Sequence, residues 1–417
     1  MAAGRRIFLA YLVYFGAIGA SFPYLPVFYR DLGLTLEEIG ILTAIQAATQ
    51  LVLGPLWGGL VDRFPRTRLT LPLAAVVATA GALDLFLATD FVAVLVGSML
   101  LYAGLAGIGP TLDARTLETL GPGRRDRYGQ VRAFGSLAFV LATLFVGLLL
   151  SVKGPRSLFW VYVPALLATV IVTSTIGRRG SNRPVSLFRG ATEILSAPGM
   201  LRLFGGFTVV WTALTALNAF YSIQIVALGG DTSWVGIAWA FGAAVEVPLM
   251  YAFPRLGARF GTERLLVLGA VAMALRAVLA ASAAVPFGLV IIAPLEGFAF
   301  ACVFVGGVTV LASRIPASLG GTVQGLFSAS AGLATIIGSV AGGTIAGAAG
   351  IPALFAACAG LGLVGAGILA FAVLGRPTPR IDTRTARERP PTLPGAALVE
   401  PEFEPERAAA SIKVDEG

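Results

Sequence analysis

The feature that most constrains this chain is a series of about twelve apolar stretches, each near the length of helix that crosses a bilayer. Roughly 20 residues of helix span the hydrocarbon core. We place the stretches near 7–28, 39–60, 69–88, 91–117, 131–151, 158–176, 203–227, 235–256, 264–283, 286–312, 323–348 and 352–375. Hydrophobic residues make up 57% of the 417 and charged residues only 12%, proportions that exclude a water-soluble domain of this size. The sequence predicts an all-α membrane protein with twelve transmembrane helices.

Lysine and arginine are distributed unevenly among the predicted loops. Of the 30, 3 lie in odd-numbered loops, and nearly all the others lie in the termini and the even-numbered loops or near the helix ends beside those loops. Basic residues near helix ends stay preferentially on the cytoplasmic side, so we expect both termini to be cytoplasmic. The basic start of the chain is followed by an apolar stretch that is longer than a signal peptide's, and we expect a retained first helix. The net charge of +8 is explained by this asymmetry, and nucleic acid is not expected as a partner.

Residue types that carry enzyme chemistry are scarce. The chain has no histidine, and its two cysteines, Cys302 and Cys358, lie in predicted helices. No Ser/Cys dyad and no cluster of metal ligands is recognisable in the sequence. We therefore expect no enzyme activity, no cofactor and no metal.

An internal repeat relates the first six predicted helices to the last six. IGIL at 39–42 matches VGIA at 235–238, and DRFPRTRL at 62–69 matches ARFGTERL at 258–265, both at an offset of 196 residues. Parallel six-helix repeats place a substrate site at their interface, near the bilayer midplane.

The repeat and the polar segments predict four regions. The segment between helices six and seven carries five arginines, and the last segment is polar with seven prolines, so we expect it to be disordered. The regions are a first six-helix half at 1–176, a cytoplasmic loop at 177–202, a second six-helix half at 203–375 and a cytoplasmic tail at 376–417.

Three ionisable residues lie roughly ten residues inside predicted helices of the second half: Glu246, Arg276 and Glu296. Such residues are costly in hydrocarbon, so they usually pair or face an aqueous cavity. One arginine cannot neutralise two carboxylates, so desolvation and repulsion favour a bound proton on one acid. The alternative is a purely structural network of buried ion pairs.

Other polar residues inside helices allow two interpretations. Gln46, Gln50, Asn218 and Gln224 either line a cavity or bond across helix interfaces. Asp84 is expected near the membrane interface. The double G-x-x-x-G in GSVAG and GTIAG, 338–347, favours packing within the chain over a dimer contact, and we expect a monomer.

The segment GPLWGGLVDRFPRTR, 54–68, resembles the loop signature of the major facilitator superfamily, G-x-x-x-D-R-x-G-R-R. The matching residues are Gly58, Asp62, Arg63 and Arg66. Pro65 and Thr67 depart from the pattern. The resemblance implies the twelve-helix major facilitator fold and a role of these residues in gating, by a pairing that locks one arrangement of the two halves.

Within that superfamily the chain resembles the lactose permease group of oligosaccharide and proton symporters. YFGAIGASFPYLPVFYRDLG at 14–33 resembles the first helix of the group, and PTLDA at 110–114 and YGQVRAFG at 128–135 resemble its sugar-gripping segments. The resemblance implies that Asp113 and Arg132 bind the substrate and that Phe139 stacks on its ring.

The same resemblance implies proton coupling by Glu246, Arg276 and Glu296, with Glu296 in place of a histidine. Ala299 and Ala293 stand where the group has its proton-carrying glutamate and a paired lysine. We predict that Glu296 carries the proton and that Glu246 pairs with Arg276.

The sequence therefore predicts a secondary active transporter of the bacterial plasma (inner) membrane. It would take up a sugar-like or other hydroxylated small solute with protons, by alternating access. Drug and proton antiport is a second hypothesis, although the G-x-x-x-G-P motif usual in helix five of such antiporters is absent at helical depth. A membrane sensor or scaffold that transports nothing is a third. For the transporter, the expected partners are the solute, protons and the lipid bilayer.

Overall fold

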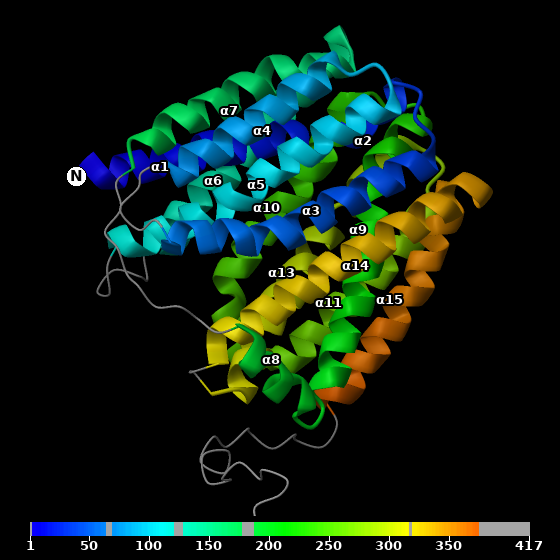
Figure 1. The fold of residues 1–417 in the computed structure, drawn as a ribbon. Coiled ribbons are helices and arrows are strands. Elements are labelled where there is room, and N and C mark those ends of the chain that lie inside the picture. The colour runs from blue at the N-terminus through cyan, green and yellow to red at the C-terminus, as the bar shows by residue number, and fades with distance from the viewer. Residues whose placement is uncertain (1, 64–68, 121–127, 177–186, 317–318, 375–417) are drawn as a thin grey trace, which may run out of the picture. The chain divides into compact units, whose positions relative to one another are not determined.

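The computed structural model describes residues 2–63, 69–120, 128–176, 187–316 and 319–374. All regular elements in these ranges are helices (Figure 1). In the first half they are α1 (Ala2–Ser21), α2 (Leu25–Asp31), α3 (Leu36–Arg63), α4 (Thr70–Leu87), α5 (Phe91–Leu120), α6 (Tyr128–Lys153), η2 (Pro155–Leu158) and α7 (Phe159–Ser174). They continue with α8 (Leu187–Ser196), α9 (Met200–Ala227), α10 (Thr232–Phe260), α11 (Thr262–Ala281), α12 (Pro286–Ile292), α13 (Pro294–Arg314), α14 (Gly320–Ala349) and α15 (Ile351–Leu374).

Twelve spans in the described residues are long and apolar enough to cross a membrane, which confirms the predicted number. The sequence did not predict α8, a short helix inside the segment expected to be a loop. The tail at 376–417 lies outside the described residues.

Two of the predicted helices are interrupted. The first is divided into α1 and α2 between Ser21 and Leu25, where Pro23 lies, and Pro26 is in the first turn of α2. The tenth is divided into α12 and α13 at Ala293, directly before Pro294. Proline has no backbone N–H and is favoured only in the first turn of a helix, so each new helix begins at or beside a proline. The second break places Glu296 in the first turn of α13.

The helices pack as two groups of six spans. In the first group α1 packs on α6 and α7, α4 on α5 and α7, and α3 on α5. In the second group α9 packs on α14 and α15, α11 on α13 and α15, and α10 on α13. The groups meet mainly where α3 packs on α14 and α6 on α10. Figure 1 shows α3 and α14 running beside each other.

These two contacts between the groups are related by the sequence repeat. α3 begins at Leu36 and α10 at Thr232, which are 196 residues apart. In one contact a Cβ added at Gly40 would lie 2.4 Å from the backbone oxygen of Ser339, and in the other a Cβ added at Gly236 would lie 2.9 Å from that of Thr143.

The glycines on the opposite helices of these two contacts, Gly343 of α14 and Gly147 of α6, are related by the same offset. A Cβ at Gly343 would meet the Leu36 oxygen at 2.9 Å, and a Cβ at Gly147 would meet the Thr232 oxygen at 2.8 Å. Each of these residues has its counterpart 196 positions away, so the internal repeat extends to single backbone contacts.

Candidate functional site

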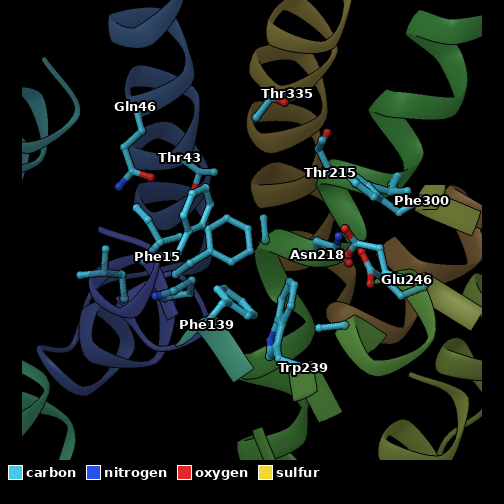
Figure 2. Close-up of a pocket in the computed structure, with 18 of the residues that line it drawn as sticks. Phe15, Thr43, Gln46, Phe139, Thr215, Asn218, Trp239, Glu246, Phe300 and Thr335 are labelled. Carbon is cyan, nitrogen blue, oxygen red and sulfur yellow. The ribbon is translucent and has the colours of Figure 1, made fainter. Parts of the chain in front are cut away.

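A cavity of about 440 Å³ lies between the two groups of helices (Figure 2). Both groups contribute to its wall, as expected for a site at the interface of two repeats. The first group contributes polar and aromatic side chains from α1, α2, α3, α5 and α6, and the second contributes them from α9, α10, α13 and α14. Aromatic side chains are prominent in the lining: Phe15, Phe22, Tyr29, Tyr102, Phe139, Trp211, Trp239 and Phe300.

Helix α6 carries Arg132, the charged residue that the first group of helices contributes to the cavity lining. Arg132, Ser136 and Phe139 all line the cavity, because residues three and four apart share one face of a helix. The Arg132 guanidinium lies over the ring of Phe15, 3.9 Å from its centroid. Its Nη1 donates a long hydrogen bond of 3.4 Å to the Ser136 Oγ. A guanidinium has five donors in a fixed fork, and the bond to Ser136 uses one of them.

Asp113, the other residue that the resemblance assigns to the substrate, has a different position. It lies on α5, where it accepts a hydrogen bond from the Tyr11 hydroxyl, and it is not part of the cavity lining. The structure therefore brings Arg132 and Phe139 into the cavity and leaves Asp113 engaged with α1.

The acidic wall belongs to the second group. Glu246 of α10 and Glu296 of α13 both line the cavity, and Glu296 is buried with an exposed fraction of 8%. A Cβ at Gly242 would lie 2.9 Å from a Glu296 carboxylate oxygen, so Glu296 packs against the α10 backbone one turn before Glu246. Figure 2 shows Glu246 and Asn218 on one side of the cavity and Phe15 and Phe139 on the other.

Arg276 of α11 lies behind this wall. Its side chain is 1% exposed, and its Nη1 donates a hydrogen bond of 2.7 Å to Oδ1 of Asn218. Its guanidinium also lies 4.4 Å from the centroid of the Tyr221 ring. Asn218 itself lines the cavity, so an uncharged amide stands between the buried cation and the cavity.

The predicted pairing of Glu246 with Arg276 is not present in this structure. Among the described residues, no ion pair within 4.0 Å joins them, and Arg276 is bound to Asn218 instead. The physical reason is the position of α11, which packs on α13 and α15 and only lightly on α10.

Two of the four uncharged polar residues line the cavity, as one interpretation of the sequence allowed. Asn218 and Gln46 line the cavity, and Gln46 donates to the Tyr29 hydroxyl at 3.1 Å. Gln224 is buried outside the lining and Gln50 is exposed. The lining residue Trp239 was not predicted, because an indole in an apolar helix carries no sequence signal for a cavity.

The predicted gating residues lie at the edge of the described structure. Gly58 is an exposed residue of α3 with open space beside its Cα. α3 ends at Arg63, but the side chains of Asp62 and Arg63 lie outside what the structure describes, as does the whole of Arg66.

Comparison with known proteins identifies the family. Residues 5–357 match the model of the MFS_1 like family. The chain is 32% identical to a maltose permease of Geobacillus stearothermophilus over 66% of its length and 70% of the permease. It is 26% identical to a probable 3-phenylpropionic acid transporter of Escherichia coli, over 69% of its length and 76% of that protein.

A solved structure with the same fold is that of the nucleoside transporter NupG. It superposes with a TM-score of 0.80 and 16% identity, covering 89% of this chain and 99% of NupG. The family match extends over most of the chain, and the related proteins are transporters rather than enzymes. The chain belongs to the MFS_1 like family and is a multi-pass membrane transporter of the major facilitator superfamily.

Proposed function

We propose that the protein takes up a neutral, sugar-like solute together with protons by alternating access. The two halves would move about the central cavity so that it opens to one side of the membrane at a time. The observation that carries this proposal is that Arg132 of the first half and Glu246 of the second half line one cavity. A guanidinium donates hydrogen bonds and a carboxylate accepts them, so together they suit a solute with several hydroxyl groups.

The aromatic lining supports a ring-shaped solute. The C–H face of a pyranose is apolar and packs on an aromatic ring, whereas its hydroxyl edge needs polar partners. Phe139 lies one turn beyond Ser136 and two turns beyond Arg132 on α6, so one helix offers both kinds of contact. We assign substrate binding to Arg132 and Phe139, with Asp113 acting through Tyr11.

The charges in the lining favour a neutral solute over an anionic one. Glu246 and Glu296 contribute two carboxylates, and Arg132 contributes one guanidinium. An organic acid would gain one favourable contact with Arg132. It would meet the Glu246 carboxylate, and that of Glu296 as well once Glu296 has released its proton, in a poorly screened space. The similarity to a maltose permease is consistent with this balance, whereas an aromatic acid such as phenylpropionate fits it less well.

We assign proton carrying to Glu296. It is buried, it follows the break between α12 and α13, and it faces the cavity. Arg276 donates to Asn218, and in the described part of the chain no ion pair within 4.0 Å joins Arg276 to Glu296 and holds Glu296 ionised. Glu246, on the same wall, would act as the second acid of the pathway.

The orientation in the membrane is also part of the proposal. We infer a bacterial inner membrane location with both termini cytoplasmic, from the distribution of basic residues. The glycine contacts of α3 with α14 and of α6 with α10 then lie toward the periplasm, and this state is closed on that side. Gly58, Asp62, Arg63 and Arg66 would act at the cytoplasmic ends of the halves.

A ligand screen by thermal unfolding of the purified protein tests the substrate class. A ligand at 100 times its Kd stabilises the native state by about 2.7 kcal/mol, which raises the Tm measurably. We expect neutral mono- and disaccharides to raise the Tm and phenylpropionate to leave it unchanged. Stabilisation by organic acids alone would contradict the neutral class, and stabilisation by lipophilic cations alone would support drug efflux instead.

A further inference from the structure

Trp239 of α10 is held in one orientation at the wall of the cavity. Its indole Nε1 donates a hydrogen bond of 3.0 Å to the Oγ of Ser222, a buried residue of α9. The only polar atom of the indole is therefore occupied by the protein. What Trp239 offers the cavity is the apolar surface of its ring.

The ring of Trp239 touches the opposite half of the protein. Phe22, between α1 and α2, meets it edge-to-face with 5.1 Å between ring centroids and an interplanar angle of 84°. Both residues line the cavity, and Phe22 is 48% exposed, so the contact is not buried in a core. It is an aromatic contact between the two halves at the edge of the cavity.

Phe139 reaches the same space from the neighbouring helix. It projects from α6, which packs on α10, and Figure 2 shows it and Trp239 both pointing into the cavity. A ring bound here would have Phe139 from the first half and Trp239 from the second as its aromatic neighbours. The apolar C–H face of a sugar ring would bury apolar area against these two aromatic rings.

Resting on the function proposed above, we propose that Trp239 is a specificity-determining residue that binds the apolar face of the solute ring and exchanges this contact with Phe22. When the halves separate on the side of Phe22, the contact with Phe22 breaks and the part of the indole that Phe22 covers becomes available to a solute. When they close, as here, Phe22 returns to the indole. Ser222 fixes the orientation of the ring in both states.

The test is equilibrium binding of maltose, glucose and sorbitol to the purified full chain. Sorbitol is the acyclic alcohol of glucose. Glucose and sorbitol therefore both present hydroxyl groups, but only glucose has a ring. Trp239→Leu should weaken maltose and glucose binding at least about tenfold, and should abolish the preference for glucose over sorbitol. Trp239→Phe should retain most of that preference, and Ser222→Ala should weaken ring binding by about threefold, because the indole is no longer held.

Trp234→Leu is the matched control. It removes the same residue type from the same helix, but Trp234 contacts Phe287 and is not part of the lining. Its affinities should equal those of the wild type. If the wild type binds sugars and Trp239→Leu binds them with unchanged affinity and ring preference, the inference is wrong and the proposed function stands. If the wild type binds neither sugar, the proposed function fails and the inference falls with it.

Discussion

Gly40 and Gly236 lie 196 residues apart in the chain, and each packs without a side chain against a backbone oxygen of the opposite half. The oxygens belong to Ser339 and Thr143, which are related by the same offset. Two equivalent glycine contacts therefore hold the halves together at one end of the molecule. Closure at this end depends on the absence of a Cβ at both positions.

Adding a single methyl group at Gly40 should shift the protein toward the state that is open at this end. The new Cβ would lie 2.4 Å from the Ser339 oxygen and 2.8 Å from the Gly343 Cα, so α3 and α14 must separate. Gly40→Ala should change the ratio of the two states by about tenfold, or 1.4 kcal/mol. Distances between spin labels on the facing ends of α3 and α14 measure this ratio.

Gly205→Ala is the control for that change, because nothing lies within 4 Å of a Cβ at this position of α9. Equal distance distributions for Gly40→Ala and Gly205→Ala would show that the glycine contact does not govern closure.

Removing the amide that binds Arg276 should destabilise the second half. Asn218→Leu deprives a buried guanidinium of the acceptor at 2.7 Å, and an unsatisfied buried charged donor costs about 2–3 kcal/mol. The expected result is a lower Tm, measured by thermal unfolding in detergent. Thr208→Val, a change on the same helix outside the cavity lining, should lower the Tm much less. Equal effects of the two changes would mean that the Arg276–Asn218 bond contributes little.

The two residues that the resemblance assigns to the sugar should behave differently. Arg132→Lys removes the planar fork from the cavity and should weaken solute binding at least about tenfold, or 1.4 kcal/mol. Asp113→Asn keeps an acceptor for the Tyr11 hydroxyl outside the lining, so its effect should be smaller. Calorimetric titration of both variants checks this order. A larger loss of solute affinity for Asp113→Asn than for Arg132→Lys would mean that the carboxylate, and not the guanidinium, is the main binding group.

Glu296→Gln should separate proton coupling from solute binding. Glutamine imitates the protonated acid and keeps the packing on Gly242, so the solute site should remain intact. Exchange of solute across vesicles should continue, because it needs no proton release, whereas accumulation driven by a pH gradient should stop. Glu246→Gln is the comparison on the same wall. A Glu296→Gln variant that still accumulates solute would make Glu296 structural.

Hydropathy and the placement of basic residues are the signals from which the twelve spans and their cytoplasmic ends were predicted, and the number of spans is confirmed. These signals depend on the length and composition of each helix, which the bilayer dictates directly. The breaks within the first and tenth spans were not predicted, although Pro23, Pro26 and Pro294 were visible. A proline in an apolar run either kinks a helix or begins a new one, and only packing against neighbours decides between them.

The site was less accessible to prediction, because it depends on which face of each helix meets the cavity. Arg132, Phe139, Glu246 and Glu296 were expected and do line it, but Asn218 was left with two interpretations and Trp239 was not expected at all. The expected partner of Arg276 was a carboxylate at similar depth. The structure has an amide there, because depth in the membrane does not fix the lateral position of a helix.

The most direct test of the central claim is uptake into vesicles that contain the purified protein. With the interior made alkaline, labelled maltose should accumulate above its external concentration, and an agent that collapses the pH gradient should abolish the accumulation. Glu296→Gln vesicles should only equilibrate the sugar. Wild-type vesicles that equilibrate or exclude maltose and the other neutral sugars at every pH gradient would contradict proton-coupled sugar uptake.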